Sequence, residues 1–297
     1  MEQFPIRTDL ALEAREFIEE ANGKMRGVIV TTSRDADDTV LITHVKITTK
    51  NGAKAMGKPI GTYITLEADH LIEPDEDYHR EVSCVIARQL RTLISCDEEE
   101  KSILVVGLGN RDVTADALGP FVVDHLNITR HMLRQFGHAA YACEKVHTIS
   151  SIVPGVMGNT GMETAEIVRG VVDSTSPDIV IAIDALAARS TRRLTRTIQI
   201  TNTGIQPGSG VGNHRDSLTE ESLGIPVIAI GIPTVVDAAT IVNDAVGHLN
   251  QDNPELKSTF QDMHNMYVTA KDIDSTIKRL GFTLSEALNM AFSFTKI

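Results

Sequence analysis

The sequence predicts an α/β protein with a mainly parallel sheet covered by helices on both faces, and with an additional antiparallel β segment in the N-terminal third. Two observations carry this prediction. From residue 102 onward, short continuous apolar runs alternate with helical patterns, which is typical of parallel strands buried on both faces. Before that point, three runs rich in Val, Ile and Thr follow one another closely, which is typical of a meander.

Two helices are expected in the first third of the chain. Thr8 is a suitable N-cap for an amphipathic helix over residues 9–22, which Gly23 ends. A second helix is predicted over residues 79–95, because its apolar residues recur at helical spacing.

Between these helices we place an antiparallel meander over residues 25–70. Its three expected strands cover residues 27–33, 39–49 and 59–68. Asn51 and Gly52 are predicted to form part of a turn between two of them, because both residue types favour turns.

The remaining two thirds of the chain follow a strand and helix rhythm. The apolar runs expected to form strands are SILVVG, VHTIS, PDIVIAIDAL, TIQIT and IPVIAIGIP. Helices are predicted over residues 117–136, 161–173 and 234–249, and the stretch from residue 253 is predicted to form helices broken near Gly281. We therefore expect residues 1–297 to form a single α/β domain, with the meander as an elaboration.

Composition and charge narrow the class of protein. The chain has a formal net charge of −12, whereas nucleic-acid binders have a basic surface that neutralises phosphates. We therefore expect no direct nucleic acid binding. A basic or neutral polypeptide is a better partner.

No apolar run approaches about 20 residues, and the N-terminus has no signal-peptide pattern, so we expect a soluble, cytoplasmic protein without membrane contact. The cysteines Cys84, Cys96 and Cys143 have the spacing of neither a disulfide framework nor a zinc site.

Two aspartates are expected where strands end, which is where ligands and catalytic groups collect in parallel sheets. Asp116 follows the turn of Gly107 and Gly109, and Asp184 is predicted to terminate the apolar run IVIAI. The turn does not match a dinucleotide fingerprint, because Asp112 stands at the position of the third glycine. Asp116 alone could be a helix N-cap, whereas a carboxylate after so apolar a strand points to a function.

Two neighbouring carboxylates allow more than one chemistry. If they share a proton, one activates water as a general base while the other donates to a carbonyl oxygen or a leaving amine. The same pair could hold a divalent metal ion, with water as a further ligand. The residues leave both alternatives open.

Three other groups have a plain structural interpretation beside a functional one. His214 is either a surface residue, a general base or a metal ligand. The acidic run over residues 70–79 is either a solvated linker or a metal site. The basic run after Asp184 is either a solvated face or a clamp for acidic substrate side chains; its members are Arg189, Arg192, Arg193 and Arg196.

Long blocks of the chain resemble the spore germination protease family. They include IRTDLALEA, VVGLGNRDVTADALGP, VPGVMGNTGMETAEIVRGVV, AIDALAARS, GIQPGSGVGN and LGIPVIAIGIPTVVDAATI. The resemblance runs from about residue 6 to beyond residue 245, and such long, ordered blocks are far more specific than a short motif.

The resemblance implies an endopeptidase of the aspartic type that degrades small acid-soluble spore proteins at germination, in the forespore and spore core. It implies a zymogen, a homotetramer, cleavage after a glutamate of the substrate, and a core like that of the hydrogenase maturation proteases. The catalytic pair falls on Asp116 and Asp184, with no cofactor and no metal carried over. Residues 1–6 would then be a short pro-segment, removed before Arg7.

Two alternatives remain beside this interpretation. One is a metal-dependent peptidase that uses the same aspartates as ligands, with or without His214. The other is a noncatalytic module that binds a nucleotide or a storage protein through its Gly-rich turns.

Overall fold

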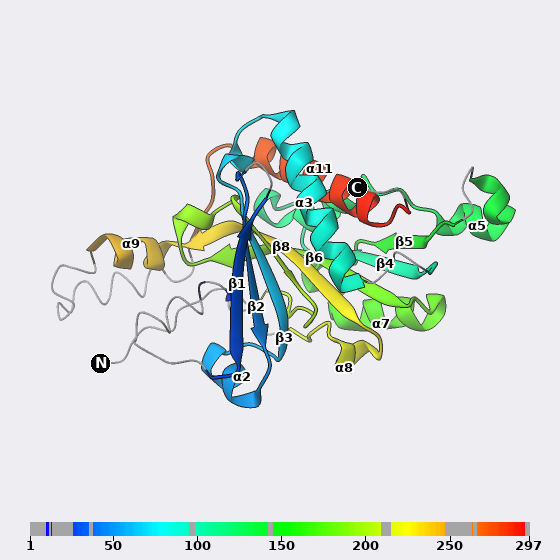
Figure 1. Ribbon diagram of the computed structural model, residues 1–297, viewed down its shortest axis with the longest axis horizontal. Coiled ribbons are helices and arrows are strands. Elements are labelled where there is room, and N and C mark those ends of the chain that lie inside the picture. Colours follow the sequence, from blue (N-terminus) through cyan, green and yellow to red (C-terminus); the bar gives the residue numbers. More distant parts are fainter. Residues whose placement is uncertain are drawn as a thin grey trace.

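The protein is described here by a computed structural model, whose described part comprises residues 10, 11, 13, 26–35, 38–94, 99–141, 145–208, 215–246, 263 and 266–294. Within it, nine strands form one sheet in the order β1-β2-β3-β7-β8-β6-β4-β5, and β9 pairs with β8 (Figure 1). The strands are β1 Val28–Arg34, β2 Leu41–Ile47, β3 Gly61–Glu67, β4 Ser102–Gly107, β5 Thr148–Ile152, β6 Ile179–Ala188, β7 Thr197–Thr201, β8 Val227–Asp237 and β9 Tyr267–Val268.

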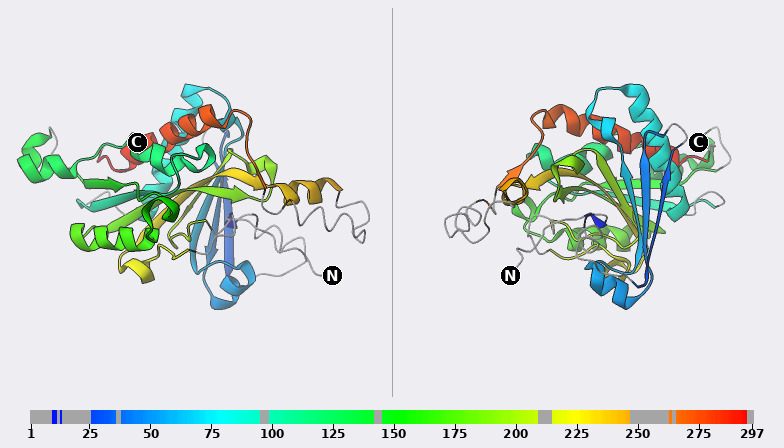
Figure 2. Two further views of the ribbon diagram at one scale, coloured as in Figure 1. Left: turned by 180° about the vertical axis from the view of Figure 1, so that it is seen from behind. Right: turned by 60° about the vertical axis from the view of Figure 1, so that its left-hand side comes forward.

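Helices cover both faces of the sheet, as the sequence predicts. Strand β4 shows why, because Ile103 and Val105 belong to the core under α3, α4 and α11, whereas Leu104 and Val106 belong to the core under α7 and α8. Figure 2 shows these two helical layers on opposite sides of the sheet. Their bounds are α3 Glu76–Ile94, α4 Leu118–Val123, α7 Thr164–Thr175, α8 Glu220–Leu223 and α11 Ile273–Ala291.

The prediction of a mainly parallel sheet is wrong. Among the strands of the described residues, only β5, β4, β6 and β8 run parallel, whereas β7 is antiparallel to both of its neighbours, β3 and β8. All five residues of β7 are buried although three of them are polar, so this strand is as buried as the parallel strands beside it. Burial on both faces sets the apolar pattern and leaves the direction of the strand undetermined.

The meander has the predicted strands and antiparallel pairing, and it forms part of the main sheet through β3 and β7. The turn predicted at Asn51 and Gly52 is wrong, because both residues belong to the helix α2, Lys50–Met56. The Thr49 side chain caps this helix by accepting a hydrogen bond from the N–H of Gly52 at 3.1 Å. A good N-cap thus outweighs the turn preference of the Asn and Gly pair.

Other predicted helices differ in extent. The helix expected over residues 117–136 is divided into α4 and α5, Arg130–Phe136, and strand β8 occupies the start of the one expected from residue 234. Most of the helix predicted over residues 9–22 lies outside the described residues. The short elements that complete the fold are η1 Asp69–Ile72, η2 Thr114–Asp116, η3 Gly137–Ala140, α6 Met157–Thr160, η4 Thr191–Arg193 and α9 Ala238–Val246.

None of the helices in the described part of the chain has the length and apolar character needed to cross a membrane.

Gly281 does not break a helix, which corrects the prediction for the C-terminal stretch. It lies inside the continuous helix α11, where a Cβ atom would lie 2.3 Å from Cδ1 of Phe121 in α4. The ring of Phe121 itself contacts the rings of His125 and Phe282. The glycine is therefore used for close packing of α4 against α11, which the sequence pattern alone does not distinguish from a break.

We expect Gly281→Ala to lower the free energy of unfolding by about 1–3 kcal/mol, because the added methyl group overpacks the contact with Phe121. Gly170→Ala is the matched control, since Gly170 is exposed in α7 and a Cβ atom there meets nothing within 4 Å. This control is expected to raise the free energy of unfolding by up to about 1 kcal/mol through helix propensity. Urea unfolding measures both, and equal effects of the two changes would contradict the packing role.

Candidate active site

Asp116 lies on a tight turn beyond the end of β4. Its carboxylate accepts a hydrogen bond from the N–H of Asn110 at 2.9 Å. Gly109 adopts φ +111°, and a Cβ atom there would lie 2.0 Å from the carbonyl oxygen of Asp116. A glycine is therefore required for the turn to close onto Asp116. Asp116 ends η2, and the N-cap residue of α4 is Ala117, so Asp116 is not the N-cap of that helix.

Asp184 lies inside β6, so the prediction that it terminates its strand is wrong. Strand β6 continues to Ala188 in parallel pairing with β8, and Asp184 is in register with Gly231. The pairing of β4 with β6 ends at Gly107 and Ile183, so Asp184 is the first residue of β6 beyond the end of β4. It is 6% exposed, and its carboxylate accepts a hydrogen bond from the N–H of Ala185 at 3.0 Å.

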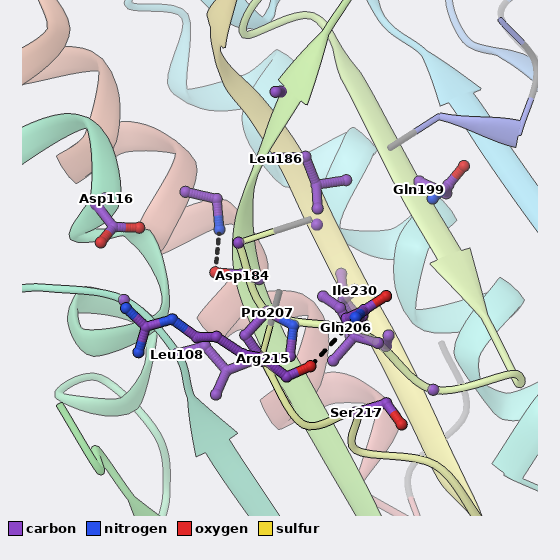
Figure 3. A pocket seen from close by; sticks show the side chains of 18 of the residues that line it. Leu108, Asp116, Asp184, Leu186, Gln199, Gln206, Pro207, Arg215, Ser217 and Ile230 are labelled. Atoms are coloured by element: carbon purple, nitrogen blue, oxygen red, sulfur yellow. Dashed lines mark hydrogen bonds between the residues drawn. The ribbon is translucent and has the colours of Figure 1, made fainter. Parts of the chain in front are cut away.

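Both aspartates line one cavity of about 940 Å³ (Figure 3). Its wall is formed by residues of β6, β7 and β8, by the turn that follows β4, and by the loop around Gly204–Gly208. The side chains in this wall are mixed, and they include Leu186, Gln199 and Arg215 beside the two carboxylates. The expectation that Asp116 and Asp184 face the same crevice therefore agrees with the structure, while their chemical roles stay a prediction.

Burial changes the acidity of Asp116. Desolvation raises the pKa of its carboxyl to about 6, and the hydrogen bond from Asn110 and the positive charge of Arg215 oppose this shift. A carboxyl group with this pKa exchanges its proton close to neutral pH. Such a group is suited to general acid or base work, in contrast to an exposed aspartate.

Arg215 is a site residue that the sequence analysis missed. Figure 3 shows its side chain extending toward the side of the cavity on which Asp116 lies. Gln206 donates a hydrogen bond to the Arg215 carbonyl at 3.2 Å, which ties the two sides of the Gly-rich loop together. A single arginine beside such a loop has no pattern in sequence that separates it from any surface arginine.

The structure bears on the predicted metal alternative only in part. His214 lies outside the described residues. Within the described ranges, no group of three or more His, Cys, Asp or Glu side chains is placed to hold a metal ion. Asp116 and Asp184 could contribute two carboxylate ligands in the cavity, so the metal alternative stays open.

The acidic run over residues 70–79 is divided between η1 and the start of α3. His70 contacts Glu73 at 2.9 Å, and this hydrogen bond and the charge of Glu73 raise the pKa of His70. His79 contacts the Thr283 hydroxyl at 2.7 Å. The His70 contact lies within the segment that precedes α3, and the His79 contact joins α3 to α11. Both contacts favour the structural interpretation of the run.

Comparison of the sequence with known proteins identifies its family. A family model described as germination protease matches residues 7–263. The chain belongs to this germination protease family. It is 45% identical to the germination protease of Caldanaerobacter subterraneus subsp. tengcongensis, with 96% of this chain and 94% of the relative covered. It is 41% identical to a germination protease of Clostridium perfringens, with 97% and 95% covered.

A third relative, the germination protease of a Geobacillus species, is 44% identical over 83% of this chain and 68% of the relative. These matches confirm the resemblance found in the sequence. Membership of the germination protease family makes the chain a peptidase, and the cavity with its two carboxylates is the candidate site for that chemistry.

The raised pKa of Asp116 predicts a pH-dependent effect of Asp116→Asn on stability. The folded chain holds this proton more tightly than the unfolded chain, so ionisation of Asp116 lowers the free energy of unfolding as the pH rises from about 4 to about 6. Asp116→Asn removes this loss. We therefore expect its unfolding temperature, relative to the wild type, to be higher at about pH 7 than at about pH 4.

Asp124→Asn serves as the control of opposite sign. Its carboxylate pairs with Arg111 at 2.6 Å, which holds the pKa of Asp124 below its ordinary range. The stability from that pair is present at neutral pH and is lost as the pH falls through the lowered pKa, so Asp124→Asn is more harmful at about pH 7 than at low pH. Thermal unfolding across this range tests both variants, and the same pH trend in both would contradict the burial of Asp116.

Proposed function

We propose that this chain is an endopeptidase of the aspartic type that initiates the degradation of small acid-soluble spore proteins during germination. The proposal rests on one observation: the carboxylates of Asp116, in the turn after β4, and of Asp184, in β6, both line one cavity. No serine or cysteine nucleophile is needed for hydrolysis of this kind, because the attacking group is water.

In the proposed mechanism, one of the two aspartates is ionised and the other is protonated. The ionised carboxylate takes a proton from water as the water attacks the peptide carbonyl carbon. The protonated carboxyl donates its proton to the carbonyl oxygen, which gives a tetrahedral intermediate with two hydroxyl groups. When this intermediate collapses, the carboxyl that took the proton from water donates it to the leaving amine, and the other carboxyl takes a proton back from a hydroxyl group as the carbonyl forms again. With its pKa raised to about 6, Asp116 can carry the proton near neutral pH, and Asp184 is its partner.

The wider biology of the proposal follows the family resemblance. We propose a zymogen, with residues 1–6 as the pro-segment removed before Arg7, and a homotetramer that acts in the forespore and spore core. The hydrogenase maturation protease fold likewise stays a prediction for the core. Family membership argues against the noncatalytic alternative, whereas the metal-dependent alternative is decided by experiment.

We expect Asp116→Asn and Asp184→Asn each to lower the rate of cleavage of a small acid-soluble spore protein by about 10²- to 10⁴-fold, because each removes one partner in proton transfer. Asp124→Asn, which changes an exposed carboxylate outside the cavity, is expected to cleave at the wild-type rate. The unfolding temperature checks that all variants fold. Near-normal turnover by either cavity variant would overturn the proposed pair.

Exhaustive chelation separates the two ways of using the carboxylates. Activity that survives chelation supports acid and base catalysis, whereas loss of activity that divalent ions restore assigns Asp116 and Asp184 as metal ligands.

Arg215→Met is expected to shift the pH profile of cleavage. Loss of the positive charge beside Asp116 raises the pKa of that carboxyl further, so the limb of the profile that titrates near pH 6 moves to higher pH. Arg111→Met is the matched control, because Arg111 pairs with Asp124 outside the cavity and its loss is expected to leave the limb in place. The profile of kcat/KM against pH gives the answer, and an unmoved limb in Arg215→Met would rule out this role.

A further inference from the structure

Strand β8 contains a bulge at Thr234, in the wall of the cavity. Two successive residues of β6 are in register with residues of β8 that lie two positions apart: Leu186 with Pro233, and Ala187 with Val235. Thr234 is therefore the extra residue of β8. Bulges are rare between parallel strands, and their usual effect is to give a side chain a new direction.

The packing on either side of Thr234 shows the effect of this extra residue. Ile232 belongs to the core under α3, α4 and α11. Val236, four residues later, would belong to the same face of a regular strand, because side chains alternate between the two faces. It packs instead with Leu186 and Ala188 in a separate cluster. The bulge thus inverts the alternation of β8 between Ile232 and Val236.

The Thr234 hydroxyl holds the turn that carries Asp116. It donates a hydrogen bond at 2.6 Å to the carbonyl oxygen of Ala115, which lies 119 residues away in the sequence. Ala115 directly precedes Asp116 in η2, and both residues line the cavity together with Thr234. Thr234 is 1% exposed, so little water competes for this hydrogen bond.

The backbone of the bulge is fixed by two further hydrogen bonds. The hydroxyl of Thr269, in the segment after β9, donates to the carbonyl oxygen of Thr234 at 2.7 Å. The N–H of Thr195 donates to the carbonyl oxygen of Pro233 at 2.7 Å. Both carbonyl groups thus have donors although the bulge interrupts the regular ladder. The Thr234 side chain is consequently attached to a well-fixed part of the sheet.

This part of the sheet also holds Asp184. Asp184 of β6 is in register with Gly231 of β8, three residues before Thr234. Asp116 comes from a separate segment of the wall (Figure 3). The hydrogen bonds from the N–H of Asn110 to Asp116 stay within its own turn, whereas the Thr234 bond joins that turn to the strand pair of Asp184.

We infer that Thr234 is a positioning residue, which fixes the Asp116 carboxyl relative to Asp184 through the carbonyl group of Ala115. The inference rests on the proposed peptidase function, since it requires that the two aspartates act on one peptide bond. Proton transfer depends steeply on geometry, and a displacement of about 1 Å can cost about 100-fold in rate. A buried hydrogen bond to the residue beside a catalytic group prevents such a displacement.

Thr234→Val tests the inference, because valine has nearly the shape of threonine and lacks the hydroxyl. We expect kcat for cleavage of a small acid-soluble spore protein to fall about 10- to 100-fold with little change in KM, since the peptide still binds while the carboxyl is misplaced. Thr234→Ser restores the hydroxyl and is expected to recover most of the lost rate.

Thr129→Val is the matched control. The Thr129 hydroxyl donates to the carbonyl oxygen of His147 at 2.6 Å, and Thr129 is 8% exposed but does not line the cavity. This variant loses a buried hydrogen bond of the same kind, so we expect a lower unfolding temperature and a wild-type kcat. An equal loss of kcat in Thr129→Val and Thr234→Val would reduce the effect to general stability and contradict the positioning role.

A second measurement needs no cleavage. Burial raises the pKa of Asp116, and in Thr234→Val water can approach its carboxyl, so we expect this pKa to fall toward its ordinary value. The gain in unfolding temperature that Asp116→Asn gives at about pH 7 relative to about pH 4 is then smaller in the Thr234→Val background than in the wild type. Lys58, Asp184 and Arg215 also line the cavity, and they are unchanged in both backgrounds.

A wild-type kcat in Thr234→Val, or an equal gain from Asp116→Asn in both backgrounds, would overturn the inference. If Thr234→Val does not fold, Thr234→Ala replaces it, and failure of both to fold would assign Thr234 to the fold as a whole and reject the positioning role. A wild-type chain that cleaves nothing would overturn the proposed function alone, because the comparison of the two backgrounds still decides whether Thr234 fixes the turn of Asp116.

Discussion

The site depends on an unequal length of neighbouring strands. The two long strands β6 and β8, of 10 and 11 residues, remain paired after the six-residue strand β4 has ended. Strand β6 therefore loses its partner on one side at the level of Asp184. The space left beyond β4 is closed by the turn that carries Asp116, so that a buried strand and an irregular turn supply the two carboxylates of one cavity.

Much of this arrangement follows from local patterns. The strands, the two helical layers and the position of Asp116 and Asp184 beside one cavity could be predicted, because burial, helical spacing and an acidic residue inside an apolar run are visible in sequence. The direction of β7 and the continuity of α11 through Gly281 could not. Both are decided by contacts between distant segments, namely β7 with β3 and β8, and Gly281 with Phe121.

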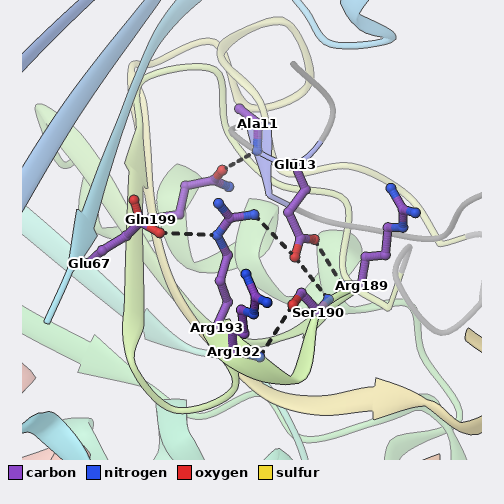
Figure 4. Close-up of polar contacts among 8 residues, drawn as sticks. All are labelled: Ala11, Glu13, Glu67, Arg189, Ser190, Arg192, Arg193 and Gln199. Atoms are coloured by element: carbon purple, nitrogen blue, oxygen red, sulfur yellow. Dashed lines mark hydrogen bonds and ion pairs between the residues drawn. The ribbon is translucent and has the colours of Figure 1, made fainter. Parts of the chain in front are cut away.

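The same reason explains the long-range polar contacts that the sequence did not indicate. Glu13 lies 176 residues from its backbone partner at Arg189, and Arg193 pairs with Glu67 across 126 residues. No spacing rule connects such positions, and in sequence they are ordinary charges of two charged segments. Only the fold places Arg193 between Glu13 and Glu67 and leaves Arg192 exposed (Figure 4).

Two arginines, Arg215 and Arg193, act on different carboxyl groups near the cavity of this acidic protein. Arg215 acts on the carboxyl where bond cleavage is proposed, and its charge offsets part of the burial cost that raises the pKa of Asp116. Arg193 pairs with the carboxylates of Glu13 and Glu67 behind the residues that line the cavity. Leu10 packs against Leu186, and Ala11 donates a hydrogen bond to Gln199, so the contacts around Glu13 continue to two residues that line the cavity. The ion pairs of Arg193 therefore fix an N-terminal segment against the wall on which Arg215 and the two aspartates lie.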